Sequence, residues 1–291
     1  MATPIPHNRC GFTAAEIISA TGASMTGSVS KLTSVSIDSR TIDEGGLFVA
    51  LRGVRDGHDF IIAAAARGAG AALVEHGRGN GVLPCFATVD TLTALGALAR
   101  FHLKRERAAR QLPLVTIGGA AGKTTTKELT AALVRALYGD ILATPGNLNN
   151  LIGVPMTLLT LCPVHRAAVL ECGTNRTGEI AQLAAMTEPD VALVLNVDIE
   201  HTEGLGSLEG VATEESAIFQ HARAAVIDTA EAMVAARVPA GMRTVTFGEA
   251  PHADVRLYRR EISEGGRQRV TLALNPTLVR DGVEPRLDAV P

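Results

Sequence analysis

The sequence lacks any apolar run that approaches the ~18 residues of a membrane-spanning helix. Its first residues, Met1 to Cys10, have neither the basic start nor the apolar stretch of a secretory signal peptide. It also lacks a large excess of charge, since 27 basic and 30 acidic side chains leave a formal net charge of −3. Such a balance gives no reason to expect a nucleic acid or an anionic membrane as partner. These absences predict a cytoplasmic protein without membrane insertion.

Cysteine is scarce as well, which argues against a fold held together by disulfides. The four cysteines show neither CxxC spacing nor the density of a disulfide framework, and they are Cys10, Cys85, Cys162 and Cys172. Apolar residues make up 46% of the 291 residues and charged residues 20%, which are ordinary proportions for a globular protein. A chain of this length predicts two domains, each large enough to bury its own core.

Residues 1–110 alternate short apolar strands with helices and are predicted to form a small N-terminal α/β domain. Thr13 and Glu16 have the spacing of a capping box at the start of a helix over Phe12–Thr21. The other expected helices are Phe60–Arg67 and Leu92–Arg110, and the expected strands are Ser34–Ile37, Gly46–Leu51, Ala71–Val74 and Cys85–Val89. Gln111-Leu-Pro113 then breaks the long helix, so we place the domain boundary there.

Residues 111–291 change to continuous apolar strands separated by helical stretches. The strands are Leu114–Ile117, Ala167–Glu171, Val191–Val197, Ala224–Ile227 and Thr244–Phe247. Because they lack polar alternation, they predict a mostly parallel sheet that is covered by helices on both faces. Ala253–Arg260 and Arg267–Leu274 do alternate, and they predict an antiparallel hairpin around Gly265-Gly266. The expected fold class is therefore α/β, with a small domain followed by a larger sheet domain.

A glycine-rich turn between a strand and a helix is the strongest functional signal. The turn and the helix start read Gly119-Ala120-Ala121-Gly122-Lys123-Thr124-Thr125. Leucines at four-residue steps and a final glycine predict the helix over Lys123–Leu137, and they are Leu129, Leu133, Leu137 and Gly139. Backbone N–H groups and the helix dipole attract phosphate at such a turn. Lys123 would reach the β- and γ-phosphates of a nucleotide, and Thr124 would offer a hydroxyl to Mg²⁺.

This turn is a shortened form of the P-loop, because Ile117 stands where the longer form has its first glycine. The alternative is a glycine-rich turn with an exposed lysine. The strand before it, the helix after it and the consecutive threonines favour the phosphate-binding interpretation.

Two other strands are followed by groups that can hold a metal at the carboxyl edge of a parallel sheet, where ligands bind. Glu171 ends Ala167–Glu171, and His201 follows Val191–Val197. A carboxylate and a neutral imidazole near phosphates make a chemically sensible metal site. The alternatives are a solvated or helix-capping Glu171 and an ion-paired His201. The amides Asn147, Asn149 and Asn150 are either turn residues or ligand-facing groups.

Taken in order, these motifs resemble those of the Mur ligases. The segments that carry the resemblance are Gly119–Lys127, Thr144–Asn150 with Ile152–Pro155, Glu171–Asn175 with Gly178–Ile180, and His201–Ser207. In the N-terminal part, the segments similar to that family's UDP-binding domain are Ser36–Ile42, Gly46–Gly53 and Asp56–Phe60. The resemblance runs from about residue 12 to about residue 275.

The resemblance implies a P-loop-type domain in an ATP- and Mg²⁺-dependent amide ligase of peptidoglycan precursor synthesis. ATP would phosphorylate the terminal carboxylate of a UDP-linked muramoyl peptide, and the amine of D-Ala-D-Ala would attack the acyl phosphate. The implied catalytic residues are Lys123, Glu171, His201 and Glu215, with ATP at Gly119–Thr125 and the metal at Thr124, Glu171 and His201. The implied substrate-binding residues are Asp38, Ser39, Arg40, Asp56, Gly57, His58, Asn147, Asn149 and Asn150.

Two departures from the family pattern limit what the resemblance implies. Glu215 stands where the family usually has a lysine carbamylated by CO₂, so it is either a permanent substitute for that carboxylate or a sign of lost ligation. The sequence also ends where the family's third, C-terminal domain would begin, which predicts weak or absent ligation by this chain alone or a partner that supplies that domain. The alternative functions are a non-catalytic or partner-dependent binding protein and a related ligase recruited to another peptide-like product.

Overall fold

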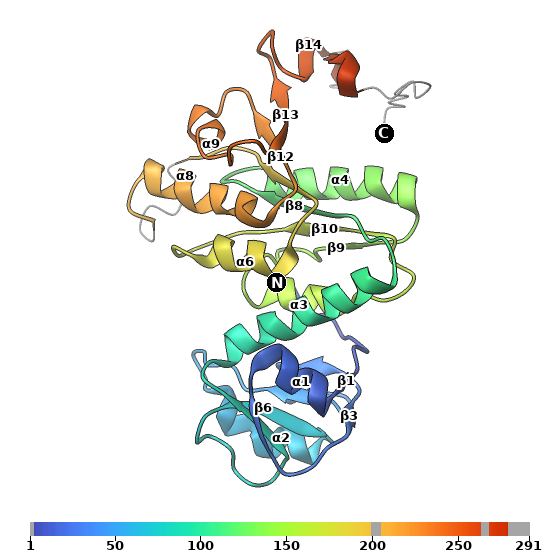
Figure 1. Cartoon of the computed structure of the whole chain (residues 1–291), viewed down its shortest axis with the longest axis vertical. Coiled ribbons are helices and arrows are strands. Elements are labelled where there is room, and N and C mark those ends of the chain that lie inside the picture. The colour runs from blue at the N-terminus through green and yellow to red at the C-terminus, as the bar shows by residue number, and fades with distance from the viewer. Residues whose placement is uncertain (1–2, 199–204, 263–267, 279–291) are drawn as a thin grey trace.

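The computed structural model describes residues 3–198, 205–262 and 268–278 of the chain. The two larger sheets follow one another along the long axis, and the helix α3 (Thr91–Ala109) lies between them (Figure 1). The lower sheet belongs to the N-terminal part and the upper sheet to the remainder. The α/β fold class predicted from the sequence is confirmed.

The N-terminal sheet, within residues 3–110, has five strands, and its edge strand β2 is antiparallel to its neighbour while the other pairs are parallel. In spatial order they are β2 (Ser24–Thr26), β7 (Cys85–Thr88), β6 (Ala71–Glu75), β5 (Leu47–Val49) and β4 (Val35–Ser36). The helices are α1 (Ala14–Thr21) and α2 (Ile61–Ala66), the latter preceded by a 3-10 turn over Gly57–Phe60.

Helix α1 begins with the capping box that the sequence predicted. Thr13 Oγ1 accepts a hydrogen bond from the N–H of Glu16 at 3.2 Å, and Glu16 Oε2 accepts one from the N–H of Thr13 at 2.7 Å. The two bonds satisfy backbone donors that the helix leaves unpaired. Phe12 was expected to be helical, but it pairs with Leu32 in the short antiparallel ladder of β1 (Phe12–Thr13) and β3 (Lys31–Leu32), so the helix starts at Ala14.

The large sheet has eight strands in the described part of the chain, and its neighbouring strands are parallel except for the last pair. Its order is β15 (Gln268–Leu274), β14 (Val255–Ile262), β13 (Arg243–Gly248), β12 (Ala224–Asp228), β11 (Val191–Val194), β8 (Leu114–Gly118), β10 (Ala167–Glu171) and β9 (Ile141–Ala143). The antiparallel pair β14–β15 is the predicted hairpin. Strand β9 was not predicted, because a three-residue strand shows no periodicity.

Helices cover both faces of this sheet, as the apolar strands predicted. Along β10, Ala168 and Leu170 pack in the core that contains α3, α5 (Gly153–Leu158) and α6 (Glu179–Thr187). Ala167 and Val169 pack on the other side, with Ala131 of α4 (Lys123–Tyr138). Successive residues of a strand point to opposite faces, so a strand buried on both sides needs an apolar residue at every position. The helical elements that follow are α8 (Leu208–Ser216), a 3-10 turn over Ala217–His221 and α9 (Ala232–Ala235).

Helix α4 has the predicted extent, but it does not bury its leucine stripe. The side chains that face the sheet are Lys127 and Ala131, both almost fully buried. Leu129, Leu133 and Leu137 are each more than half exposed. The four-residue spacing therefore identified the helix without indicating which side packs against the sheet.

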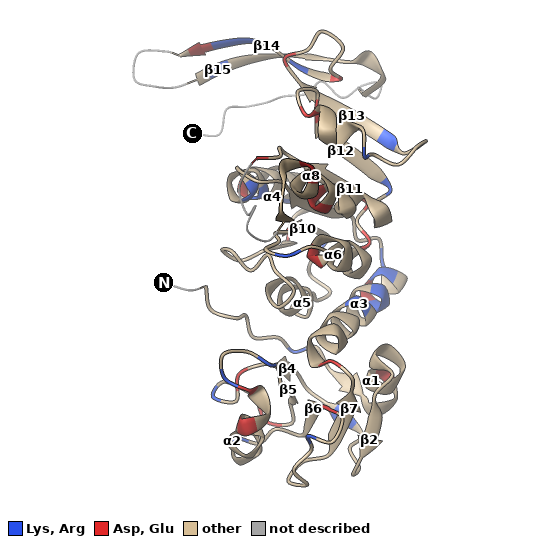
Figure 2. Ribbon diagram, turned by 90° about the vertical axis from the view of Figure 1, so that its left-hand side faces the viewer, with Lys and Arg blue, Asp and Glu red and all other residues tan. Residues whose placement is uncertain are grey.

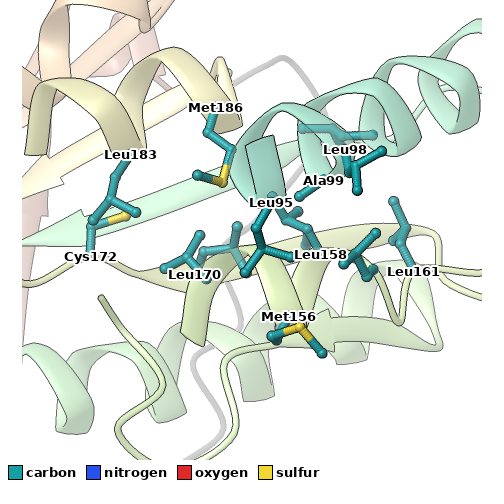
Figure 3. Close-up of a cluster of buried hydrophobic side chains, with 14 of the residues drawn as sticks. Leu95, Leu98, Ala99, Met156, Leu158, Leu161, Leu170, Cys172, Leu183 and Met186 are labelled. Carbon is teal, nitrogen blue, oxygen red and sulfur yellow. The ribbon is translucent and has the colours of Figure 1, made fainter. Parts of the chain in front are cut away.

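Helix α3 packs against both halves of the molecule. Leu95, Leu98 and Ala99 lie in one buried cluster with side chains of α5, α6 and β10 (Figure 3). The same helix packs against α1 of the N-terminal part. Because α3 contacts elements on either side of it, the boundary at residues 110–111 stays a prediction.

Ion pairs reinforce this connection along the basic half of α3, which is visible in Figure 2. Arg100 and Lys104 both pair with Glu188, and Arg107 pairs with Asp190 at 2.8 Å. Both acidic partners lie in the loop that precedes β11. Within the described ranges, no helix combines the length and apolarity needed to cross a bilayer.

Candidate active site

The glycine-rich turn joins the end of β8 to the start of α4, as predicted. Gly122 has φ 82° at the N-cap of α4, and Gly119 has φ 123°. A Cβ at Gly119 would lie 3.0 Å from the backbone nitrogen of Leu195, so both conformation and space require glycine there. No side chain caps α4, so its first N–H groups are available to an anion such as phosphate.

Lys123 is folded onto this turn. Its Nζ donates hydrogen bonds to the carbonyl oxygens of Gly119 and of Ala120, the latter at 2.8 Å. Asn196, which the sequence reasoning missed, holds the next residue: Ala121 N–H donates to its Oδ1 at 2.8 Å, and its Nδ2 donates to the Ala121 carbonyl at 3.1 Å. Asn196 lay inside the expected strand Val191–Val197, whereas β11 ends at Val194, so Asn196 lies beyond the carboxyl edge of the strand, where ligands bind.

Glu171 lies at the end of β10 beside the glycine-rich turn Gly119–Thr125, called the phosphate loop below for its predicted role. The sequence predicted a metal ligand at this strand end. The residue is 1% exposed, and its Oε1 accepts hydrogen bonds from Asn149 Nδ2 at 2.8 Å and from Thr124 Oγ1 at 3.3 Å. Its Oε2 is buried and has no hydrogen-bond partner within the described ranges. A buried carboxylate oxygen without a donor is costly. Because hard oxygen ligands suit Mg²⁺, Glu171 and Thr124 fit this ion.

His201 falls in residues 199–204, outside the described residues, so its predicted metal role is not tested. Among the residues that are described, no group of three or more His, Cys, Asp or Glu side chains is arranged to hold a metal. Mg²⁺ at nucleotide sites commonly takes one or two protein ligands together with phosphate and water oxygens. The pair Thr124 and Glu171 is compatible with that mode of binding.

The three predicted amides have different positions. Asn149 contacts Glu171, as described above. Asn150 Oδ1 accepts hydrogen bonds from the N–H groups of Ile152 and Gly153, so it anchors the start of α5. Asn147 Oδ1 accepts a hydrogen bond from Thr3 Oγ1 at 2.8 Å. The structure therefore brings only Asn149 of these three to the candidate metal ligands.

A buried lysine is connected to Glu171 through hydrogen bonds of Thr144. Lys127 is fully buried, and its Nζ donates to the Thr144 carbonyl at 3.0 Å and pairs with Glu128. Thr144 Oγ1 in turn accepts a hydrogen bond from the N–H of Glu171 at 2.9 Å. The phosphate-loop helix and the loop that carries Asn149 are thus tied together. The sequence reasoning did not single out Lys127, because a lysine on a helix is ordinarily exposed.

Glu215 lies on α8 and is almost fully buried against the phosphate loop. Its Oε2 accepts a hydrogen bond from the N–H of Gly119 at 2.7 Å. Burial raises the pKa of Glu215, whereas the Gly119 N–H and the charge of Lys123 oppose that rise. The neighbouring Glu214 is also buried, but its carboxylate accepts hydrogen bonds from the N–H groups of Gly178 and Ile180.

The N-terminal segments predicted to bind the UDP moiety meet at one cleft of about 340 Å³. Asp38, Ser39, Arg40 and Gly57 line it, and Arg40 forms an ion pair with Asp38 at 2.7 Å. His58 is buried beside this cleft. Its Nε2 accepts a hydrogen bond from the N–H of Glu75 at 3.0 Å.

His58 and Asp56 form an internal pair. Because Nε2 of His58 accepts a backbone N–H, a neutral ring carries its proton on Nδ1, which donates to Asp56 Oδ1 at 2.6 Å. Arg78 also contacts Asp56, at 2.8 Å from Oδ2. Both ring nitrogens of His58 are thus engaged within the fold, and a substrate-binding role for Asp56 and His58 stays a prediction.

The low pKa of Asp56 predicts that its protonation contributes to unfolding in acid. The N–H and ring of His58, and the Arg78 guanidinium, hold the pKa of the Asp56 carboxyl well below its usual range. The free energy of folding that the ionised Asp56 carboxylate contributes is therefore present above the unfolded-state pKa of ~3.9. It is lost as the pH falls through the lower folded-state pKa. Asp56→Asn should lower the urea midpoint near neutral pH and flatten its fall in acid. Parallel pH curves for the two proteins would contradict this role.

Comparison with known proteins assigns the family. Residues 117–275 match the Mur ligase middle domain, and residues 31–137 match the Mur ligase family catalytic domain. The chain belongs to the Mur ligase family, a group of ATP-dependent amide ligases.

Within that family, the chain is 47% identical over 189 residues to the UDP-N-acetylmuramoyl-tripeptide–D-alanyl-D-alanine ligase of Escherichia coli strain K12. It is 35% identical over 262 residues to the protein of the same name from Mycobacterium tuberculosis. These alignments cover 65% and 82% of this chain, but 40% and 51% of the two relatives. The chain thus spans about half the length of the curated relatives it matches.

Solved structures agree with this assignment. A crystal structure of MurF from Acinetobacter baumannii matches with a TM-score of 0.83 and 29% identity, over 91% of this chain and 58% of that one. The MurF ligase of Thermotoga maritima, crystallised in complex with ADP, matches with a TM-score of 0.74 and 31% identity, over 83% of this chain and 56% of that one.

Proposed function

We propose that this protein acts in the ATP-dependent ligation of D-Ala-D-Ala to a UDP-linked muramoyl tripeptide, a cytoplasmic step of peptidoglycan precursor synthesis. The observation that carries the proposal is the convergence of Thr124 and Glu171 beside the Lys123 loop. The similarity to relatives named for this reaction supports the choice of substrates. The ADP bound in the Thermotoga relative supports ATP as the nucleotide.

The proposed reaction has two chemical steps. A carboxylate oxygen of the tripeptide attacks the γ-phosphorus of ATP, which forms an acyl phosphate and releases ADP. The amine of D-Ala-D-Ala then attacks the acyl carbon, and the tetrahedral intermediate loses phosphate and a proton to leave the amide. Both steps shift negative charge onto phosphate oxygens, so positioning and charge neutralisation do most of the catalytic work.

The residues of the site have separate roles in this scheme. Lys123 moves from the carbonyls of its own turn to the β- and γ-phosphates, while the N–H groups at the start of α4 bind phosphate oxygens. Thr124 and Glu171 hold Mg²⁺, which supplies charge neutralisation when bound. Asn149 fixes the Glu171 carboxylate through its 2.8 Å hydrogen bond.

The test separates binding from ligation. The purified chain is titrated calorimetrically with MgATP and with the UDP-muramoyl tripeptide, and both are expected to bind. It is then incubated with both ligands and D-Ala-D-Ala, and mass spectrometry measures the UDP-muramoyl pentapeptide against released phosphate. Product that requires every component, with one phosphate per amide, supports the proposal. Failure to bind either ligand would contradict it.

Glu171→Gln is the matched variant, since it keeps the size and removes the charge. We expect it to bind the UDP-muramoyl tripeptide normally, because Glu171 does not line the cleft of the N-terminal part. Its Mg²⁺-dependent nucleotide binding should weaken about tenfold or more, as expected for loss of a charged ligand. Unchanged Mg²⁺ dependence would exclude Glu171 from the metal site.

A second candidate function is a non-catalytic or partner-dependent binding protein, and Glu215 in place of the family's lysine is the observation that favours it. Binding of both ligands without any product would support that alternative. Product formed with another amine, but not with D-Ala-D-Ala, would indicate a ligase recruited to a different peptide-like product.

A further inference from the structure

Helix α8 carries two adjacent buried carboxylates that contact different loops of the site. Glu214 accepts hydrogen bonds from Gly178 and Ile180, at the start of α6. Glu215 instead accepts the N–H of Gly119, the first residue of the phosphate loop. The two side chains are neighbours in sequence and similarly buried, but of the two only Glu215 contacts the phosphate loop.

A side chain on the backbone beside Glu215 would meet the Glu215 carboxylate first. A Cβ on Gly118 would lie 2.9 Å from Glu215 Oε2, closer than real Cβ contacts, whereas the next atoms, on Ile218 and Cys172, are at 3.5 and 3.9 Å. Gly118 does not have a positive φ, so its backbone accepts alanine without strain. An alanine at this position would therefore push the Glu215 carboxylate aside rather than strain the backbone.

We propose that Glu215 is a positioning residue that fixes the phosphate loop for nucleotide through the Gly119 N–H, and that Gly118 is part of the same arrangement because it leaves room for the carboxylate. The inference rests on the loop binding a nucleotide, the first step of the proposed function. It assigns to Glu215 a backbone-holding role, distinct from a carboxylate that substitutes for a carbamylated lysine at a metal.

The sign of the effect on nucleotide affinity tests this role. A carboxylate near the polyphosphate repels it, so Glu215 can favour binding only if holding the loop contributes more than the repulsion costs. If Glu215 acts mainly through its charge, Glu215→Ala should tighten MgATP binding. If it holds the loop, the same variant should weaken binding, because the loop must then be ordered at the expense of binding free energy.

The experiment is a double-mutant cycle on the full chain, read by calorimetric titration with MgATP. We expect Glu215→Ala to weaken binding about tenfold, as for loss of a charge-assisted hydrogen bond. Glu215→Gln should restore most of the affinity, because its amide oxygen still accepts the Gly119 N–H. Gly118→Ala should weaken binding in the native background and have little further effect together with Glu215→Ala.

Tighter binding by Glu215→Ala, or independent effects of the two substitutions, would overturn the proposal. A second readout needs no nucleotide: amide hydrogen exchange in the peptide over residues 114–125 should speed up in Glu215→Ala and stay near native in Glu215→Gln. Glu214→Ala is the matched control, and it should speed exchange over residues 174–182 instead. Unchanged exchange at the phosphate loop in Glu215→Ala would also overturn it.

These outcomes are separable from those of the ligation test. Absence of amide product in a protein that shows the Glu215–Gly118 coupling would count against the ligase and leave the positioning role intact. Ligation in a protein without that coupling would count against the positioning role and leave the ligase intact.

Discussion

Replacing Lys123 with methionine is expected to weaken MgATP binding by about 100-fold or more. The methionine keeps much of the aliphatic volume but removes the cation that would contact the β- and γ-phosphates. The variant would lose two charge-assisted hydrogen bonds to the phosphates, each contributing about 1.5–3 kcal/mol to binding. The variant also loses the bonds from Lys123 Nζ to the carbonyls of Gly119 and Ala120, so the empty loop should become less ordered.

Calorimetric titration with MgATP measures this effect, and thermal unfolding shows whether the fold is kept. Lys104→Met is the matched control, because Lys104 is exposed on α3 and pairs with Glu188 at the surface. It should change nucleotide affinity by less than a factor of about two, as is usual for surface substitutions. Equal affinity of Lys123→Met and the native protein would show that this turn is not the phosphate site.

Leu95→Ala is expected to destabilise the whole described fold by about 2–5 kcal/mol. Leu95 is fully buried on α3, in the cluster with Leu158 of α5 and Met186 of α6 (Figure 3). Truncation removes apolar contacts and leaves a cavity in a close-packed interior, where neighbours relax only in part. Each kcal/mol should lower the melting temperature by roughly 2–4 °C in a chain of this size.

Because α3 packs against both halves, the destabilisation should appear in the transitions of both. Calorimetry and urea unfolding measure it, and Leu129→Ala is the matched control. Leu129 lies on the exposed side of α4, and its loss should cost within about 0.5 kcal/mol. A Leu95→Ala protein in which only the N-terminal half melts earlier would contradict a structural role for α3 in joining the two sheets.

Local sequence signals predicted most of the secondary structure well. The strand at Ala167–Glu171 and the helix from Lys123 were correct because each rests on contiguous residues with a regular pattern. The short strand β9 was missed for the opposite reason. The leucines of α4 show a further limit, since a period of about four residues marks a helix but not the side that the sheet covers.

The site residues show the same difference between local sequence signals and tertiary contacts. The chemical types of Lys123, Thr124 and Glu171 could be assigned from motifs, but their spatial relations could not. Thr124 and Glu171 are 47 residues apart in sequence, and they meet because β8 and β10 are adjacent parallel strands with their carboxyl ends at one edge. For His58, the resemblance implied a substrate-binding role that stays a prediction, and only the structure showed that its ring is hydrogen-bonded to Asp56 and to the N–H of Glu75.

The sequence by itself determined the class of this protein: an α/β chain with a glycine-rich phosphate turn and the motifs of a Mur ligase. These follow from neighbouring residues, whose geometry the backbone fixes within a few bonds. Only the tertiary structure decided that Asn196, Lys127 and Glu215 support that turn and the adjacent carboxylate. Asn196 and Glu215 reach the turn across 75 and 96 residues, and Lys127 reaches Thr144 across 17. Many polar side chains compete for such contacts until packing selects one.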